Sequence, residues 1–291
     1  MFGLLTGEDL TTGWRYDIEL SVLPEYNSHL RTQLDMIRAI FLVELSLITF
    51  TRLLLSQSYS PPPASASVIA PIRFDSAKPL DPELHKRFQG CDDRDQCDGK
   101  ALKYKCSNDP NRNSVFLKLA DGTIFYNAKM AVDADGAEFT KTTPGMTDQA
   151  ETSFRYPRTS NSLDADKVPY VVVPNPEFEK PLGIQLGDIA AVVYRDKIAF
   201  AIVGDHGPKC KIGEGSIHLH KILGQKGCKK RDQNGVCKAA AGDSIERDVL
   251  YFIFPGSKAK IIDRITPENI NVRLTIEGQK LWDALRSAYR R

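Results

Sequence analysis

The pattern of apolar and polar positions from about residue 110 onward predicts strands joined by tight turns. Two β-rich runs within 114–133 flank an Asp-Gly pair at 121–122, which favours a hairpin turn. A second pair of runs, within 188–205, meets at the polar dipeptide 195–196. The run YVVVP (170–174) is apolar throughout, as in a strand buried on both faces. These segments indicate a domain built mainly from strands.

Helical periodicity is found in fewer places. Residues 275–291 carry apolar side chains at helical spacing and end in basic residues, which suits the helix dipole. Residues 214–224 predict a shorter helix that stops at Gly224, and residues 248–256 predict one more strand. We therefore expect an α+β, β-rich fold: a small β-barrel or barrel-like sheet with a few peripheral helices.

The N-terminal part of the chain differs from the rest. Its apolar run at 39–50 contains Glu44 and is shorter than the roughly 20 residues of a membrane-spanning helix, so no stable membrane span is expected. The run is closer to a signal-peptide core with a small-residue cleavage site at 64–66; the alternative is an ordinary amphipathic or buried helix. The Pro/Ser-rich stretch 56–67 predicts an extended, poorly ordered linker.

These features predict two parts of the chain. Residues 1–66 would be a leader, signal or anchor segment with its linker, and residues 67–291 the functional domain, with its motifs concentrated at about 110–256. The composition is that of a globular protein, with 42% hydrophobic and 26% charged residues. A formal net charge of +2 is too small to predict nucleic-acid binding.

The cysteines point to an exported protein. An even number, with none before residue 91, fits up to three disulfides in a secreted or extracytoplasmic chain. The absence of a C-x2-C pair argues against zinc. Six cysteines allow fifteen pairings, of which only a local bridge across the polar loop 229–236 is favoured. The six are Cys91, Cys97, Cys106, Cys210, Cys228 and Cys237.

Two carboxylates occupy glycine-flanked junctions in IAFAIVGDHGPKCKIGEGS (198–216). Asp205 follows a hydrophobic strand, and Glu214 stands nine residues later. Glycine permits tight turns and close approach of a ligand, and loops on rigid strands often carry catalytic groups. Glycoside hydrolysis needs two such carboxyl groups, one on each side of the scissile bond. Because the chain has 37 Asp and Glu residues, most of which are expected to be solvated surface charges, this pattern alone is a weak signal.

A set of segments in a fixed order strengthens the signal. FYNAKMAVDADG (125–136), YVVVP (170–174), GDIAAVVYRDK (187–197), IVGDHGP (202–208) and IGEGSIHLHKILG (212–224) together resemble the fungal-type chitosanases, glycoside hydrolase family 75. The resemblance covers about half of the chain. The cysteine-rich stretch 226–241 departs from the matching segments and would reshape one side of a cleft.

The resemblance implies endo-acting hydrolysis of β-1,4 bonds in chitosan by an inverting mechanism that uses no cofactor. By motif, the family's catalytic Asp falls on Asp205 and its catalytic Glu on Glu214. Their roles stay open. If Glu214 opened the predicted helix, the dipole would favour its ionised form and a role as base, whereas the apolar neighbour Ile212 would favour the opposite.

Asp133 and Asp135, in VDADG, are further candidates. An Asp-x-Asp-Gly segment occurs in calcium loops, but the acidic residue expected at loop position 12 is replaced by Pro144. Two other readings remain open. One is a turn stabilised by side-chain to backbone hydrogen bonds, and the other is a subsite for the ammonium groups of glucosamine.

Several ring-bearing residues complete the candidate site. His206, next to Asp205, is expected to line the cleft, and Tyr170 and Tyr194 are candidates for stacking on sugars. A metal site is not predicted, because His218 and His220 would point in different directions on a helix.

The expected partner is therefore chitosan or a related amino-polysaccharide, with no nucleic acid, and the protein is expected to be a monomer. Two alternatives remain: a non-catalytic carbohydrate- or cell-wall-binding module, and a hydrolase of another amino-polysaccharide. A binding module would not need both Asp205 and Glu214, and both are present.

Overall fold

A closed ring of six strands organises the protein. The computed structural model describes residues 59–101, 106, 115–143, 149–175, 178–242 and 244–290. The segment 39–50, interpreted above as signal-like, lies outside the described residues. Among the described residues, no helix is long and apolar enough to cross a membrane.

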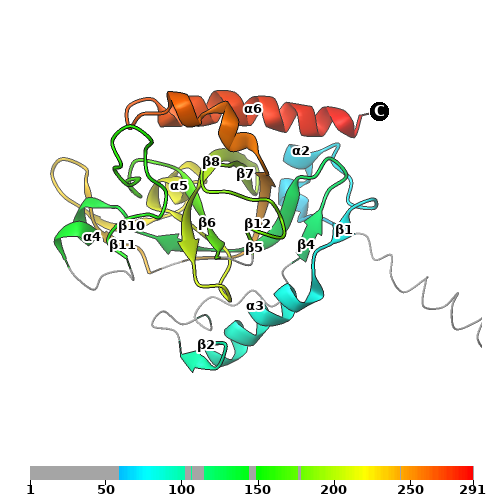
Figure 1. The fold of residues 1–291 in the computed structure, drawn as a ribbon, viewed down its shortest axis with the longest axis horizontal. Coiled ribbons are helices and arrows are strands. Elements are labelled where there is room, and N and C mark those ends of the chain that lie inside the picture. The colour runs from blue at the N-terminus through cyan, green and yellow to red at the C-terminus, as the bar shows by residue number, and fades with distance from the viewer. Residues whose placement is uncertain are drawn as a thin grey trace, which may run out of the picture. The chain divides into compact units, whose positions relative to one another are not determined.

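The main sheet has eight strands in the order β1-β4-β5-β12-β7-β8-β6-β9, and β9 also pairs with β5, which closes the ring from β5 to β9 (Figure 1). Two junctions of the ring, β6–β8 and β5–β9, are parallel, and the other four are antiparallel. The strands are β1 (Lys78–Pro79), β4 (Val115–Lys118), β5 (Ile124–Asp133), β6 (Tyr170–Pro174), β7 (Ile189–Tyr194), β8 (Lys197–Gly207), β9 (Glu214–Ser216) and β12 (Ile245–Phe254). The expected β-rich α+β fold with a small barrel is confirmed.

The helices and two small hairpins lie around this barrel. Figure 1 shows α6 on one side of it and α3 on the opposite side. The helices are α2 (Pro63–Ile69), α3 (Pro82–Arg94), α4 (Glu138–Thr142), α5 (Ile217–Ile222), α6 (Ile270–Ala288) and the short 3-10 turns η1 (Ser257–Lys260) and η2 (Ile262–Arg264). The hairpins pair β2 (Gln96–Cys97) with β3 (Lys100–Ala101), and β10 (Cys228–Arg231) with β11 (Cys237–Ala240).

Successive side chains of each barrel strand point to opposite faces of the wall, and this produces two hydrophobic cores. One core contains Phe252 together with Trp282 of α6, so it lies on the outer face of the barrel. The other contains Tyr126 and Tyr251, whose rings stack with centroids 4.3 Å apart, and fills the barrel interior. Small side chains such as Ala190 suit the narrow interior.

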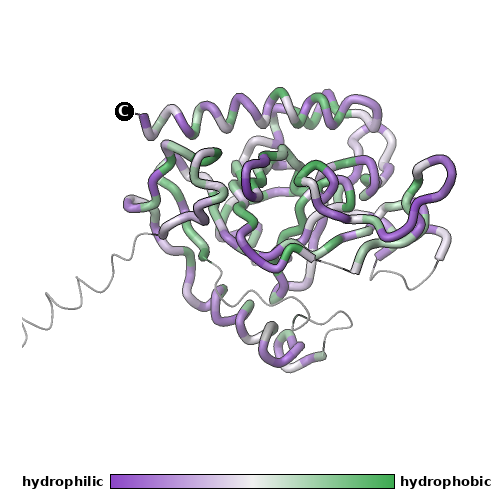
Figure 2. The backbone as a smooth tube through the Cα atoms, turned by 180° about the vertical axis from the view of Figure 1, so that it is seen from behind, coloured by the Kyte–Doolittle hydropathy of each residue, from purple (hydrophilic) through white to green (hydrophobic). Residues whose placement is uncertain are grey.

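Helix α6 begins five residues before the predicted start at residue 275. Hydrophilic and hydrophobic positions alternate along it, as Figure 2 shows, and its apolar face contacts β7 and β8. At the contact, Gly278 leaves room for the Phe200 ring, because a methyl group there would lie 2.5 Å from Phe200 Cγ. The interpretation of this segment as an amphipathic helix is confirmed.

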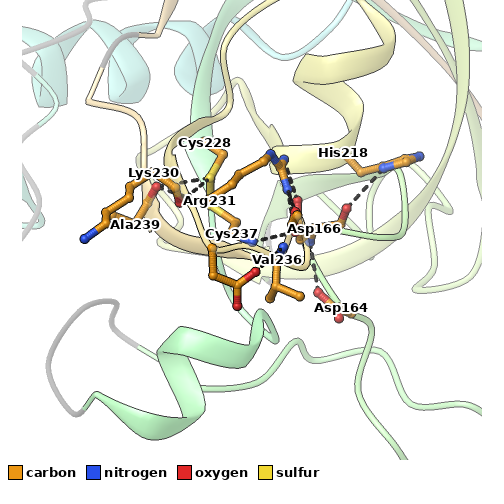
Figure 3. The surroundings of a disulfide bond; sticks show 11 residues. Asp164, Asp166, His218, Cys228, Lys230, Arg231, Val236, Cys237 and Ala239 are labelled. Atoms are coloured by element: carbon orange, nitrogen blue, oxygen red, sulfur yellow. Dashed lines mark hydrogen bonds and ion pairs between the residues drawn. A yellow bond between two sulfur atoms is a disulfide. The ribbon is translucent and has the colours of Figure 1, made fainter.

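Three disulfides link all six cysteines, and they are Cys91–Cys106, Cys97–Cys210 and Cys228–Cys237. The last is the predicted local bridge, and it joins β10 to β11 (Figure 3).

The Asp166 carboxylate holds this hairpin against the body of the domain. It accepts a bidentate pair of 2.8 Å hydrogen bonds from the Arg231 guanidinium and a third, of 2.9 Å, from the Cys237 amide. The cysteine-rich insert is therefore a fixed part of the domain.

The prediction of an extended linker at 56–67 is wrong for its C-terminal part. Residues Pro63–Ile69 form α2, and Ile69 at its end is 1% exposed in the outer core. Tyr59 also packs against this core and accepts a hydrogen bond from Asn127. The proline that suggested a linker stands in the first turn of the helix, where a missing N–H is tolerated.

An irregularity in the pairing of β6 with β8 sets the direction of Asp205. Val171 pairs with Val203, but the next residue, Val172, pairs with Asp205, so Gly204 is the extra residue of a β-bulge. Without the bulge, Asp205 would share the inward direction of Val203. The bulge turns it to the outer face, where Val172 also points.

Gly204→Ala should lower the free energy of unfolding by about 1–3 kcal/mol, the usual range for overpacking. A methyl group there would lie 2.6 Å from Tyr170 Cβ and 2.7 Å from Leu163 Cδ1. Urea denaturation measures the change. Gly242→Ala is the matched control, because nothing lies within 4 Å of its added methyl, and it should change stability little. Equal stabilities of the two variants would contradict this account of the bulge.

Candidate active site

Asp205 and Glu214 flank a single residue of the barrel wall. Val172 of β6 is the register partner of Asp205 on one side and of Glu214 on the other. Because neighbouring strands lie about 4.8 Å apart, the Cα atoms of the two acidic residues are about 10 Å apart. Residues nine positions apart in the sequence are thus brought together by two adjacent strand pairings.

The two carboxylates point to the same side of the wall. A methyl group at Gly215 would meet Leu219 and Met130 of the interior core, so its neighbour Glu214 points outward. A methyl group at Gly207 would lie 3.2 Å from Glu214 Oε2 and 3.2 Å from a methyl of Val172. Glycine at 207 therefore leaves the space next to the Glu214 carboxylate and Val172 free of a side chain.

The Asp205 carboxylate is buried, with an exposed fraction of 1%. Its Oδ1 accepts three hydrogen bonds: from the Ser153 amide at 2.8 Å, from the Ser153 hydroxyl at 2.6 Å and from the His206 amide at 2.8 Å. Burial raises the pKa of Asp205, and these hydrogen bonds only partly oppose the rise. Since Oδ1 is already occupied by donors, a proton on this group resides on Oδ2.

Glu214 has a different environment. Its Oε1 lies 2.7 Å from the Lys211 Nζ, and both side chains are largely shielded from water. The predicted helix 214–224 is wrong at its start, because Glu214–Ser216 is strand β9 and the helix begins at Ile217 with Ser216 as its N-cap. Glu214 therefore does not open a helix, and the positive charge beside it comes from Lys211.

Asp133 and Asp135 extend the acidic cluster onto β5. The Asp133 carboxylate accepts a 2.8 Å hydrogen bond from the Asp135 amide, so the expected side-chain-stabilised turn is present. Burial holds the pKa of Asp133 well above its ordinary value, and repulsion from neighbouring carboxylates adds to the effect. These neighbours are Asp135, Asp205 and Glu214.

The cluster is suited to a positively charged ligand. Carboxylate oxygens of Asp133, Asp135 and Asp205 all lie within 4.8 Å of one another. A metal ion or a substrate ammonium group would relieve their repulsion, and hard oxygen ligands of this kind are those that calcium and magnesium use.

His206 extends the acidic surface next to Asp205. Its Nε2 lies 2.7 Å from Glu179 Oε1, and its Nδ1 lies 3.4 Å from the Asn175 amide. The imidazole is partly exposed beside the buried Asp205.

The two tyrosines have other positions than expected. Tyr170 is fully buried, and its hydroxyl donates a 3.0 Å hydrogen bond to the Asp135 carbonyl, so it supports the acidic turn and has no free face for a sugar. Tyr194 pairs with Lys197 at the start of β8, whereas Asp205 is near its end. Eight residues of strand separate these points by about 25 Å, so Tyr194 lies outside the cluster.

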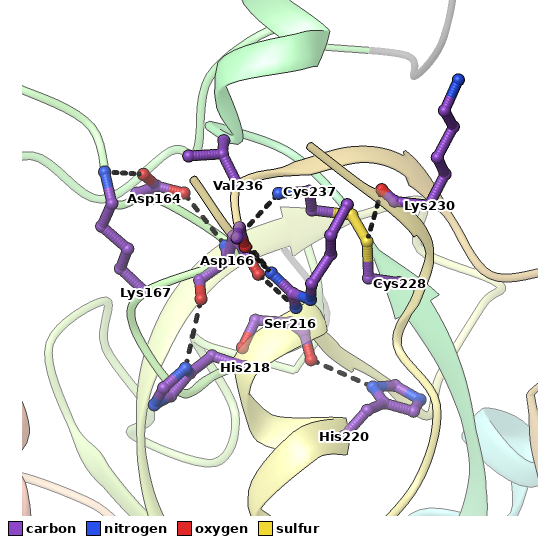
Figure 4. A network of polar contacts seen from close by, with 12 residues as sticks. Asp164, Asp166, Lys167, Ser216, His218, His220, Cys228, Lys230, Val236 and Cys237 are labelled. Carbon is purple, nitrogen blue, oxygen red and sulfur yellow. Dashed lines mark hydrogen bonds and ion pairs between the residues drawn. A yellow bond between two sulfur atoms is a disulfide. The ribbon is translucent and has the colours of Figure 1, made fainter. Parts of the chain in front are cut away.

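A polar network surrounds Ser216, the last residue of β9 (Figure 4). Ser216 Oγ donates to the Val168 carbonyl and accepts from the Tyr170 amide. His218 faces the Asp166 carbonyl, and the buried His220 faces the carbonyl oxygens of Ser216 and Met130. These histidines hold backbone segments together and face separate carbonyl groups.

Sequence patterns did not indicate several residues of this site. Ser153 lies 52 positions from Asp205, and Glu179 lies 27 positions from His206, so no local motif connects them. The contact of Lys211 with Glu214 could have been predicted, because a lysine three residues before a candidate catalytic glutamate can reach it within one loop.

Two carboxylates on one face of the wall, on either side of a gap that a glycosidic bond could occupy, are typical of glycoside hydrolases. Here they lie within a larger acidic cluster. A family model described as fungal chitosanase of glycosyl hydrolase group 75 matches residues 130–281. The match covers more than half of the chain, and the chain belongs to this family. No curated protein matches the chain. The protein is thus a chitosanase-type glycoside hydrolase whose family implies a polysaccharide substrate.

Asp133→Asn should stabilise the protein at neutral pH. Because the folded state raises the pKa of Asp133 above its unfolded value near 3.9, folding binds a proton, and stability falls as the pH rises between the two values. The fall is at most about 1.4 kcal/mol per pH unit. Urea unfolding from pH 3 to pH 8 measures it.

The free energy of unfolding of Asp133→Asn should therefore exceed that of the parent protein by little near pH 3 and by more toward neutral pH. Asp196→Asn, at an exposed turn, is the control and should follow the parent curve. A constant difference between Asp133→Asn and the parent across the whole pH range would show that Asp133 titrates normally.

Proposed function

We propose that this protein hydrolyses β-1,4-glycosidic bonds within chitosan by single displacement, with Asp205 as the general acid and Glu214 as the general base. The observation that carries the proposal is the placement of both carboxylates on one face of the barrel wall, on either side of Val172. Inverting enzymes need carboxyl groups about 6.5–9.5 Å apart, with room for a water molecule between the base and the sugar. A Cα separation of about 10 Å is compatible with that spacing.

The roles follow from the two environments. A general acid must hold its proton near neutral pH, and burial raises the pKa of Asp205 in that direction. A general base must be held where it can take a proton from the attacking water, and the Lys211 ammonium 2.7 Å from Glu214 Oε1 fixes that carboxylate in place. In the reaction, Asp205 Oδ2 gives its proton to the leaving glycosidic oxygen, while Glu214 accepts a proton from the attacking water.

The acidic cluster supports an amino sugar as the substrate unit. Asp133 and Asp135 adjoin the proposed catalytic pair, and Asp133 is held near other carboxylates at an electrostatic cost. A protonated glucosamine would reduce that cost on binding, whereas a neutral N-acetylglucosamine would not. We therefore assign Asp133 and Asp135 to substrate binding, with His206 lining the same region.

Export of the protein is part of the proposal. Three disulfides fit an oxidising, extracellular environment, where a polymer too large to enter a cell would be degraded. The catalytic domain of the proposed monomer includes Tyr59 and helix α2, so it begins before residue 67.

Asp205→Asn and Glu214→Gln should each reduce kcat on chitosan by at least about 100-fold while leaving the fold intact, because each removes a proton-transfer group. Release of reducing ends measures activity, and circular dichroism and thermal unfolding check the fold. The matched controls Asp196→Asn and Glu246→Gln change exposed carboxylates outside the cluster and should keep parental activity. A folded, fully active variant at position 205 or 214 would exclude that residue from the mechanism.

Chitosans of graded acetylation should be cleaved more slowly as acetylation rises, because fewer ammonium groups are offered to Asp133 and Asp135. Proton NMR of the first products should show the α-anomer formed from the β-linked polymer, as single displacement requires. A β-anomer as first product would refute the inverting mechanism, and equal rates at every degree of acetylation would refute the ammonium subsite.

A further inference from the structure

The short loop from Pro208 to Gly213, between the two strands of the proposed catalytic pair, is fixed by three consecutive side chains. Lys209 forms an ion pair with Asp98, and Cys210 forms the disulfide with Cys97. Lys211 then forms the 2.7 Å ion pair with Glu214. Two of these contacts anchor the loop to an N-terminal hairpin, and the third reaches the proposed base.

The ion pair between Lys211 and Glu214 is shielded from solvent. The side chains are 10% and 14% exposed, so the pair interacts through a medium of lower effective dielectric constant than water. Surface ion pairs contribute little, but partial burial makes the loss of one partner costly to the other. Lys211 is therefore able to fix the position of the Glu214 carboxylate.

Several acidic groups interact with Glu214. Asp133 from β5 and Tyr251 from β12 interact with it electrostatically, and Asp205 of β8 lies across Val172. Ionised aspartates at these positions would repel the Glu214 carboxylate. Lys211 supplies a positive charge 2.7 Å from Glu214 Oε1 that opposes this repulsion. The buried Lys129 of β5 also lies near this loop, against Gly213.

The anchor of the loop is itself rigid. Cys97 and Asp98 belong to the β2–β3 hairpin, whose turn residues Asp98 and Gly99 both have positive φ, as tight two-residue turns require. The disulfide Cys91–Cys106 lies beside Cys97–Cys210 in one buried cluster. This anchor precedes residue 130, where the family match begins.

We propose that Lys211 is a positioning residue that holds the Glu214 carboxylate for catalysis, and that the Cys97–Cys210 disulfide keeps Lys211 in place. This inference rests on the proposed role of Glu214. The β2–β3 hairpin would then contribute to catalysis indirectly, because the Cys97–Cys210 disulfide joins it to the loop beside the proposed base.

The test compares kcat and KM for Lys211→Met and Lys211→Arg in the full chain. Lys211→Met should lower kcat by at least about 10-fold and change KM little, because a carboxylate that has lost its ion-pair partner is less often aligned with the attacking water. Lys211→Arg keeps an ion-pair partner for Glu214 and should restore most of the parental kcat. Lys226→Met removes an exposed lysine outside this loop, so its kcat and KM should stay parental.

The disulfide is tested with the double variant Cys97→Ser/Cys210→Ser, assayed well below its melting temperature. It should lower kcat with little change in KM, as Lys211→Met does, and adding Lys211→Met to it should give less than the sum of the two effects. The matched control, Cys228→Ser/Cys237→Ser, removes a bridge from a different hairpin and should leave kcat and KM unchanged.

Glu214→Gln is assayed alongside these variants to separate the two claims. If Glu214→Gln stays active, the proposed function fails, whatever Lys211 does. If Glu214→Gln is inactive but Lys211→Met keeps the parental kcat, the proposed function survives and the positioning role of Lys211 is refuted. Full additivity of Lys211→Met with the Cys97/Cys210 double variant would refute the role of the disulfide.

Discussion

The structure depends on the closure of the barrel by β9. This strand has three residues, yet it pairs with β5 on one side and β6 on the other, so its register is fixed from both directions. Ser216 secures it further, because its hydroxyl binds the backbone of β6 and of the preceding loop and also caps α5. A strand constrained in this way can hold Glu214 at a fixed place on the wall with little conformational freedom.

The same closure brings acidic groups closer than they would lie on an open sheet. Asp133, Glu214 and Asp205 stand on three neighbouring segments of the wall, β5, β9 and β8, with only β6 between the last two. Burial, and next the repulsion from these neighbours, raise the pKa of Asp133, so its ionised form is a cost to the folded protein. Strain of this kind is retained where function needs it, and here it prepares a surface for a cationic polymer, although the chain as a whole carries a charge of only +2.

Local patterns in the sequence predicted the parts of the fold that local forces determine. The hairpins of β4–β5 and β7–β8, the fully apolar β6, the helix α6 and the bridge Cys228–Cys237 all match the structure. Each combines a clear period or turn signal with partners that are near in sequence. The acidic turn at Asp133 and Asp135 was recognisable for the same reason.

The features that escaped prediction depend on distant partners. Strand β9 was assigned to a helix, because three residues beside glycine show no period of two, and only the neighbouring strands make them extended. The bulge at Gly204 is visible only in the pairing of β6 with β8. Likewise, Ser153 and the Cys97–Cys210 bridge connect positions 52 and 113 residues apart in the sequence. The residues proposed for catalysis were therefore named from motif, and their common face became visible only in the fold.

The most direct test of the central claim is a crystal structure of Glu214→Gln with a bound glucosamine oligosaccharide. The account predicts that the chain of sugars crosses the outer face of the wall over Val172, with a glycosidic oxygen within about 3 Å of Asp205 Oδ2. A water molecule should lie between the sugar and residue 214, and an ammonium group should lie beside Asp133. An oligosaccharide bound on another face, with no sugar near Asp205 or residue 214, would contradict it.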